Sequence, residues 1–329
     1  MALGNLGSRR SGPGLTERWV PGSMSDSVGG ADRAKPPLIT AARREFHEGL
    51  FQTGVVHRRG AKLNIADTGA SVRLAEGFVR LLSHEVGSGP AAGQTTGRRF
   101  ENAVRDYLSS LLESSADRLA GTWSVECNRS IADFAQYGHL RILERLAADR
   151  REVRIALGGE YVVKPDVVVS RSRLADADFN ASRSVVDTIS AQRALLRTAQ
   201  IPLLHASISC KLTIRSDRSQ NSRLEALNLI RSRRGRVPHI VVVTAEPLPS
   251  RIESIALGTG DFDCIYHIAL PELLEATRAA VRENTERPPS GRRPNRADLA
   301  VERQLEKLEL MIDGQRLRDI SDLPLDLLL

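Results

Sequence analysis

Three polar residues in two apolar segments have the types that phosphodiester hydrolysis needs. Asp166 follows Pro165 in the first segment, and Ser209 and Lys211 stand two residues apart in the second. A carboxylate can bind a divalent cation, and a lysine ammonium can orient or deprotonate an attacking water and stabilise developing charge. Mg²⁺ prefers hard oxygen ligands, so Asp166 and the backbone carbonyl of Cys210 are the candidate metal ligands. If adjacent strands bring Asp166 and Lys211 together, the pattern predicts Mg²⁺-dependent hydrolysis.

A helix predicted just after the second segment supplies a further acid. Arg218, Ser222 and Glu225 are spaced i, i+4, i+7, which puts them on one helix face. Glu225 can therefore point back at the aspartate–lysine pair while Arg218 reaches a ligand. Glu101, on an earlier predicted helix, is another candidate acid.

The start of the helix after Lys211 carries side chains that can read base pairs. Arg215 and Arg218 bring positive charge to a helix N-terminus, where the macrodipole disfavours it, so a negative partner would explain them. Arginine donates two hydrogen bonds to guanine O6 and N7, and aspartate accepts one from cytosine N4. Arg215, Asp217 and Arg218 could thus read G·C pairs in the major groove, each bidentate contact adding roughly 1–3 kcal/mol of discrimination.

Each of these residues also has an ordinary structural interpretation. A Ser-x-Lys pair usually lies on a solvated strand face, and Asp217 could simply pair with the arginines beside it, which stabilises little. Glu225 could be a solvated helix residue. Glu101 could pair with a neighbouring arginine of its own helix.

The elements that must position these residues alternate between strands and helices. From Leu203 to Ile214 the even positions are apolar and the odd positions after Leu203 are polar, which predicts a strand with one buried face and one face for chemistry. The run Tyr161–Val169 predicts a second strand, with apolar odd positions and Asp166 on the other face. Further strands are predicted at 122–127, 238–244 and 262–268, and helices near 39–50, 74–82, 96–111, 131–148, 216–234, 249–257, 271–283 and 297–311. Residues 57–71 are expected to form a polar loop. The alternation predicts an α/β fold with a central mixed sheet.

Composition limits the class of protein. The 329 residues carry a formal net charge of +7, which favours a polyanionic partner, and 4% aromatic residues argue against a base-stacking single-strand binder. The three scattered cysteines indicate neither a disulfide framework nor a zinc cluster. No apolar run has the length of a membrane span and no secretory signal is present, so we expect a reduced, soluble, cytoplasmic protein. Residues 1–37, rich in Gly, Ser, Arg and Pro, are expected to be a disordered extension, and 38–329 one domain.

Four longer motifs resemble the NgoMIV family of type II restriction endonucleases. They span residues 205–218, 238–247, 254–260 and 319–326, within a similarity that covers roughly residues 40–329. The resemblance implies a restriction-endonuclease-like (PD-(D/E)xK nuclease) fold, with recognition and catalysis in one endonuclease domain. It also implies a homotetramer, a dimer of dimers binding two DNA sites, in a restriction-modification system. The implied reaction is Mg²⁺-dependent cleavage of double-stranded DNA at GCCGGC, after the first G, with four-base 5′ overhangs.

The same resemblance implies roles for single residues. The catalytic set it implies is Asp166, Ser209, Lys211, Glu225 and, as accessory acid, Glu101. The DNA-recognition set is Arg215, Asp217 and Arg218 for the inner CCGG, Arg251 for the outer guanine, Asp67 for the outer cytosine, and Gln94 in the minor groove. Without the resemblance, Asp67, Gln94 and Arg251 would read as ordinary polar loop residues.

Two alternative functions stay open from the sequence. Another nuclease of the same fold, of the repair or junction type, would act on DNA structure and be indifferent to a scrambled site. A non-catalytic, sequence-specific DNA-binding protein would have kept only the reading residues. The intact Asp166, Lys211 and Glu225 argue against that second alternative.

Overall fold

The computed structural model describes residues 35–67, 69–88, 93–116, 119–157, 162–258, 260–286 and 296–328. The chain divides into Met1–Lys35 and Pro36–Leu329, and the second unit holds all the elements below. The disordered extension expected over residues 1–37 lies outside the described residues except at its end, so it stays a prediction. In the described ranges, no helix is both long and apolar enough to cross a membrane.

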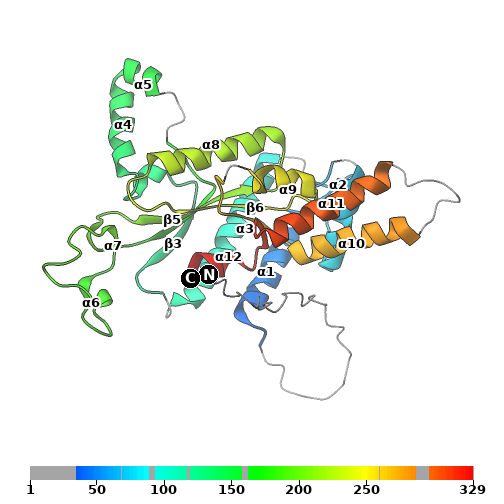
Figure 1. The fold of residues 1–329 in the computed structure, drawn as a ribbon, viewed down its shortest axis with the longest axis horizontal. Coiled ribbons are helices and arrows are strands. Elements are labelled where there is room, and N and C mark those ends of the chain that lie inside the picture. Colours follow the sequence, from blue (N-terminus) through cyan, green and yellow to red (C-terminus); the bar gives the residue numbers. More distant parts are fainter. Residues whose placement is uncertain are drawn as a thin grey trace, which may run out of the picture. The chain divides into compact units, whose positions relative to one another are not determined.

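A mixed sheet forms the centre of this unit (Figure 1). Across the described residues its order is β3 (Trp123–Cys127), β4 (Val167–Arg171), β5 (Leu203–Lys211), β6 (His239–Thr244), β7 (Cys264–His267) and β8 (Leu317–Asp319). β4 runs antiparallel to β3 and β5, whereas β5, β6, β7 and β8 are parallel. The predicted α/β fold with a central mixed sheet flanked by helices is confirmed.

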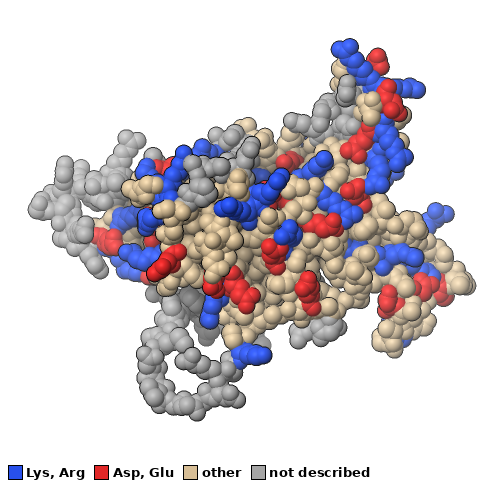
Figure 2. Space-filling model, turned by 180° about the vertical axis from the view of Figure 1, so that it is seen from behind, with Lys and Arg blue, Asp and Glu red and all other residues tan. Residues whose placement is uncertain are grey.

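The helices surround this sheet in groups that are distant in sequence. They are α1 (Leu38–Gln52), α2 (Gly69–Leu81), α3 (Gly93–Ser114), α4 (Gly138–Asp149), α5 (Arg151–Leu157), α6 (Asp176–Phe179), α7 (Leu195–Thr198), α8 (Ser216–Ser232), α9 (Pro249–Ala256), α10 (Leu270–Glu286), α11 (Arg296–Asp313) and α12 (Leu323–Leu328). α3 packs against β3, β4 and β5 with α1 beside it, while α9 packs on β7 and both α10 and α11 pack on β8. In Figure 1, α8 runs along the sheet and the α4–α5 pair projects from it. Figure 2 shows many basic side chains along that projection, with acidic ones among them.

β5 confirms the predicted strand and shows where its polar face is open. Leu204, Ala206 and Ile208 are buried in the hydrophobic core. Burying a side chain of the size of Leu or Ile adds roughly 1.5–3 kcal/mol of stability. On the other face, Ser209 is also buried, because α8 covers it. The polar face is therefore buried at Ser207 and Ser209 and partly exposed at His205 and at Lys211, where the strand ends.

The predicted strand Tyr161–Val169 is wrong at its start and in its pattern. β4 begins at Val167, after Pro165, whose missing N–H cannot join a ladder. Val167, Val168 and Val169 are all buried, so both faces of this strand are covered rather than one.

Three other expectations differ from the structure. α3 begins at Gly93, so the predicted N-cap Thr96 and the residues expected in a loop before it belong to its first turn. The expected loop at 57–71 contains a hairpin of β1 (Arg58–Arg59) and β2 (Lys62–Leu63), too short to show a strand period. The helix predicted from 131 begins with a 3₁₀ turn, Ile131–Asp133, and becomes α-helical only at Gly138.

Candidate active site

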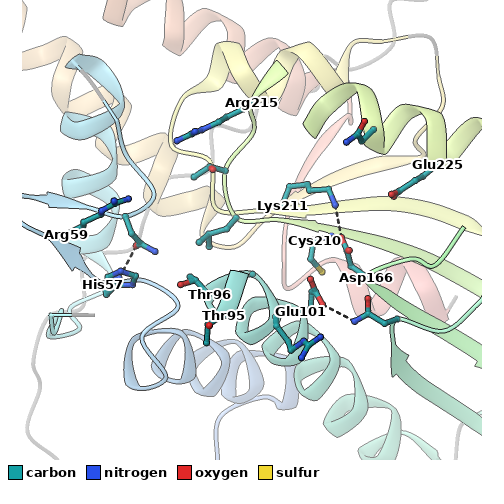
Figure 3. A pocket seen from close by; sticks show the side chains of 17 residues that line it. His57, Arg59, Thr95, Thr96, Glu101, Asp166, Cys210, Lys211, Arg215 and Glu225 are labelled. Carbon is teal, nitrogen blue, oxygen red and sulfur yellow. Dashed lines mark hydrogen bonds and ion pairs between the residues drawn. The ribbon is translucent and has the colours of Figure 1, made fainter. Parts of the chain in front are cut away.

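A cleft of about 950 Å³ lies where the end of β5 meets α3, α8 and the β1–β2 hairpin (Figure 3). The strand and α8 contribute one wall, and the hairpin and α3 contribute the other. The labelled lining residues are His57, Arg59, Thr95, Thr96, Glu101, Asp166, Cys210, Lys211, Arg215 and Glu225. Acidic groups gather at one end of the cleft, while Arg59 and Arg215 lie toward the other, so the cleft offers both a cation site and contacts for an anion.

Asp166 and Lys211 form an ion pair in this cleft. The lysine Nζ lies 2.8 Å from Asp166 Oδ2, and the same oxygen accepts a hydrogen bond of 2.7 Å from the backbone N–H of Cys210. The pair follows from the sheet: Asp166 directly precedes β4, and the antiparallel register sets the start of β4 beside the end of β5. Both side chains are mostly buried, with 20% of Asp166 and 17% of Lys211 exposed.

The environment keeps Lys211 charged. Burial alone lowers its pKa, but the charge and hydrogen bond of Asp166, with the charge of Glu225, outweigh burial and raise the pKa above its ordinary value. Lys211 is therefore protonated at neutral pH, and it is suited to donating hydrogen bonds rather than to removing a proton.

Glu101 and Glu225 approach the ion pair from α3 and α8 (Figure 3). Burial raises the pKa of Glu101, and the charge of Asp166 raises it further. Burial also raises the pKa of Glu225, with Asp166 adding to the effect and Lys211 opposing it. Glu101 also accepts a hydrogen bond of 3.2 Å from the Asn128 amide. Carboxylates gathered this closely form a site whose negative charge a cation would relieve.

The oxygen donors in the cleft fit Mg²⁺ better than a softer metal. Within the described ranges, no three His, Cys, Asp or Glu side chains form a metal-binding cluster. Mg²⁺ needs no such cluster, because it takes one or two carboxylates and completes its shell with water and substrate oxygens. Asp166, Glu101 and the Cys210 carbonyl match that requirement. Burial raises the pKa of the Cys210 thiol well above its usual value, so the sulfur stays neutral and is no ligand.

Ser209 contacts a helix rather than the cleft. Its hydroxyl lies 3.3 Å from the hydroxyl of Ser222, and it does not line the cavity. Since Ser222 is on α8, one turn before Glu225, this contact fixes the helix that carries that acid.

The residues expected to read DNA lie in three places. Arg215 is exposed, occupies the N-cap position of α8 and lines the cleft. Asp217 and Arg218 belong to the first turn of α8, and Gln94 to the first turn of α3, but their side chains are outside the described part.

The two residues expected at the outer base pair are ion-paired with each other. An Arg251 guanidinium nitrogen binds a carboxylate oxygen of Asp67, although the residues are 184 positions apart in sequence. Arg251 is on α9, and Asp67 precedes α2.

Sequence reasoning missed Glu246, which is fully buried behind the reading residues. It accepts hydrogen bonds from the backbone N–H groups of Ile214 and Leu248 and lies 3.4 Å from Arg251 Nη1. Its one sequence signal is an acid between Ala245 and Pro247, at the end of an apolar strand. Arg59 of the hairpin was also missed, because residues 57–71 were expected to be a polar loop in which Asp67 alone had a role.

Comparison with known proteins identifies the family. A family model described as NgoMIV restriction enzyme matches residues 46–287 and 295–329. The type II restriction enzyme NgoMIV of Neisseria gonorrhoeae is 43% identical over 301 residues, which cover 88% of this chain and 99% of that relative. The match includes every residue of the cleft. The resemblance predicted from the motifs is thereby confirmed: this chain belongs to the NgoMIV restriction enzyme family, and it is a type II restriction endonuclease.

Proposed function

We propose that this enzyme cleaves double-stranded DNA at GCCGGC, after the first G, and leaves four-base 5′ overhangs by Mg²⁺-dependent hydrolysis. One observation carries the proposal: the Asp166–Lys211 ion pair lies in the same cleft as Arg215, which begins α8. A hydrolytic pair and a base-reading arginine in one cleft make cleavage and recognition parts of a single binding event.

The catalytic roles follow from the contacts of each residue. Asp166, Glu101 and the Cys210 carbonyl would hold Mg²⁺. When bound, the ion would neutralise charge on the scissile phosphate and make the attacking water more acidic. Lys211, kept protonated by its acidic neighbours, orients that water and stabilises negative charge on the phosphate. Glu225 acts through its charge on Lys211, and Ser209 acts by fixing α8 through Ser222.

The recognition roles rest on hydrogen-bonding chemistry. Arg215, Asp217 and Arg218 would read the inner CCGG from the major groove. The Arg251–Asp67 pair would read the outer G·C pair, because it presents a donor for guanine beside an acceptor for cytosine. Gln94 would contact the minor groove.

The larger setting of the activity is also part of this proposal. Residues 38–329 would form one endonuclease domain that assembles as a homotetramer, a dimer of dimers with two DNA sites. The enzyme would act in the cytoplasm with a protecting methyltransferase of its restriction-modification system.

Plasmid cleavage tests the proposal. With Mg²⁺, plasmids containing GCCGGC should give discrete fragments whose sequenced ends begin after the first G. Lys211→Ala should lower the cleavage rate by about 10²–10³-fold, as loss of one donor to a transition state does, while DNA binding is retained. Lys164→Ala, the same change at an exposed lysine two residues before Asp166, should cut at the normal rate.

The alternative functions give different outcomes. Cleavage that ignores a scrambled site would favour a repair or junction nuclease. Specific binding without any cleavage by the unmodified protein would favour a non-catalytic DNA-binding protein. Normal cutting by Lys211→Ala would remove that lysine from the mechanism.

A further inference from the structure

Glu246 lies at the point where the two groups of reading residues meet. It lies two residues beyond the carboxyl end of the central strand β6, is fully buried, and does not line the cleft. It therefore cannot touch a base itself, and any effect on recognition must pass through its neighbours.

One carboxylate oxygen of Glu246 fixes the backbone before Arg215. Oε2 accepts a hydrogen bond of 2.8 Å from the N–H of Ile214, which is itself buried. Ile214 directly precedes the N-cap residue of α8, so this bond sets where the inner reading residues begin.

The other oxygen serves the residues expected at the outer base pair. Oε1 accepts 3.1 Å from the N–H of Leu248, the N-cap residue of α9, and lies 3.4 Å from Arg251 Nη1. The remaining terminal nitrogen of Arg251 binds Asp67. Glu246 thus orients the guanidinium from one side while Asp67 holds it from the other.

We infer that Glu246 is a positioning residue for sequence recognition, holding the start of α8 and the side chain of Arg251 in one fixed arrangement. This inference rests on the proposed function, because it concerns how GCCGGC is read. An ionised carboxylate suits the role, since both its oxygens only accept and can serve three donors together. A glutamine amide of the same size turns its NH₂ toward one of those donors and must release either the backbone or Arg251.

The test uses four duplexes that share CCGG and differ only in the outer pair: GCCGGC, ACCGGT, TCCGGA and CCCGGG. We expect Glu246→Gln to lower the preference in kcat/KM for GCCGGC over the other three by at least about tenfold, the value of a lost base contact. Glu253→Gln is the matched control, because Glu253 is on the same helix as Arg251 but pairs with Lys307. It should keep the preference of the unmodified enzyme.

A uniform rate loss on all four duplexes, with the preference unchanged, would show a merely structural role and overturn the inference.

Amide hydrogen exchange of the DNA-free protein gives a second readout that needs no cleavage. In Glu246→Gln, exchange should rise together in residues 212–218 and 248–256, and unchanged exchange in either segment would contradict the link. Should the unmodified enzyme cut none of the duplexes, the proposed function fails while the exchange result still decides this inference. If Glu246→Gln does not fold, Glu246→Asp, which keeps the charge but shortens the reach, takes its place in both measurements.

Discussion

The buried carboxyl of Glu246 links the stability of this protein to pH. Burial raises its pKa to about 7, although hydrogen bonds from Ile214 and Leu248 and the charge of Arg251 act in the opposite direction. The folded pKa is above the ordinary value of 4.5, so the folded state binds this proton more tightly than the unfolded state does. The stabilisation is fully present below about pH 4.5 and is lost as pH rises through about 7, and the shift corresponds to roughly 3 kcal/mol.

Glu246→Gln should remove this pH dependence. We expect the free energy of unfolding of the variant, relative to that of the unmodified protein, to increase by about 1–3 kcal/mol between pH 5 and pH 8, because the variant has no charge to bury. Urea unfolding at several pH values measures this difference. Glu253→Gln should follow the unmodified protein, and parallel pH curves for all three proteins would contradict the assigned cause.

Single residues differ in how far the sequence can predict them. That Asp166 and Lys211 would meet could be predicted, because each is a polar residue flanked by apolar ones in a predicted strand and both have the types that hydrolysis needs. Ser209 shares the alternation of Lys211, yet its partner depends on where α8 packs, and an alternating pattern does not contain that information. The three partners of Glu246 are Ile214 between β5 and α8, Leu248 just before α9, and Arg251 within α9, so only the folded arrangement could show its role.

At the scale of elements, the packing of α2 on α10 positions one of the outer reading residues. α2 begins two residues after Asp67, and Gly77 on this helix faces Ala276 of α10. A Cβ added at Gly77 would lie 2.8 Å from the Ala276 Cβ, closer than two carbon atoms can approach. The glycine therefore permits the helix contact, and a side chain there would displace α2 and with it Asp67.

We expect Gly77→Ala to destabilise the protein by about 1–3 kcal/mol, because overpacking outweighs the better helix propensity of alanine. Gly49→Ala is the control: Gly49 is also inside a helix, α1, and a Cβ there meets no atom within 4 Å. That variant should gain up to about 1 kcal/mol from propensity alone. Thermal or urea unfolding distinguishes the two, and a similar gain in both variants would show that α2 and α10 have room to adjust.

The boundaries of elements were predicted less well than their existence. β5, β6 and α9 agree with the predicted segments within a few residues, since long apolar alternation or an apolar run with flanking prolines marks them. The β1–β2 hairpin was missed because strands of two residues have no period to detect. The strand predicted in the place of β4 was extended too far toward its start. The alternation of apolar residues continues through Pro165, but proline has no N–H to join the hydrogen bonds between strands.

At the scale of the whole molecule, the net charge of +7 indicates a polyanionic partner without locating it. Basic and acidic side chains are interspersed over the face in Figure 2 rather than separated into one basic surface. Arg215 and the hairpin residue Arg59 instead both line the cleft. Local placement, more than total charge, therefore supports DNA as the ligand of the cleft.

If the enzyme is a tetramer, as proposed, its mass and its rate of cutting on DNA with two sites should both show it. Sedimentation at working concentration should give four times the 36.0 kDa mass of the chain. A plasmid with two GCCGGC sites should be cut faster than one with a single site, because tethering raises the effective concentration of the second site at the same assembly. On the projecting α4–α5 pair, Ile142 is 60% exposed and Ile155 is 69% exposed, and this apolar surface is compatible with contact between chains.

Short duplexes carrying the site, added in trans, should accelerate cutting of the single-site plasmid, and duplexes with a scrambled site should not. A monomer in sedimentation together with equal rates on both plasmids would contradict the tetramer, while cleavage by Lys211→Ala tests the cleft chemistry separately.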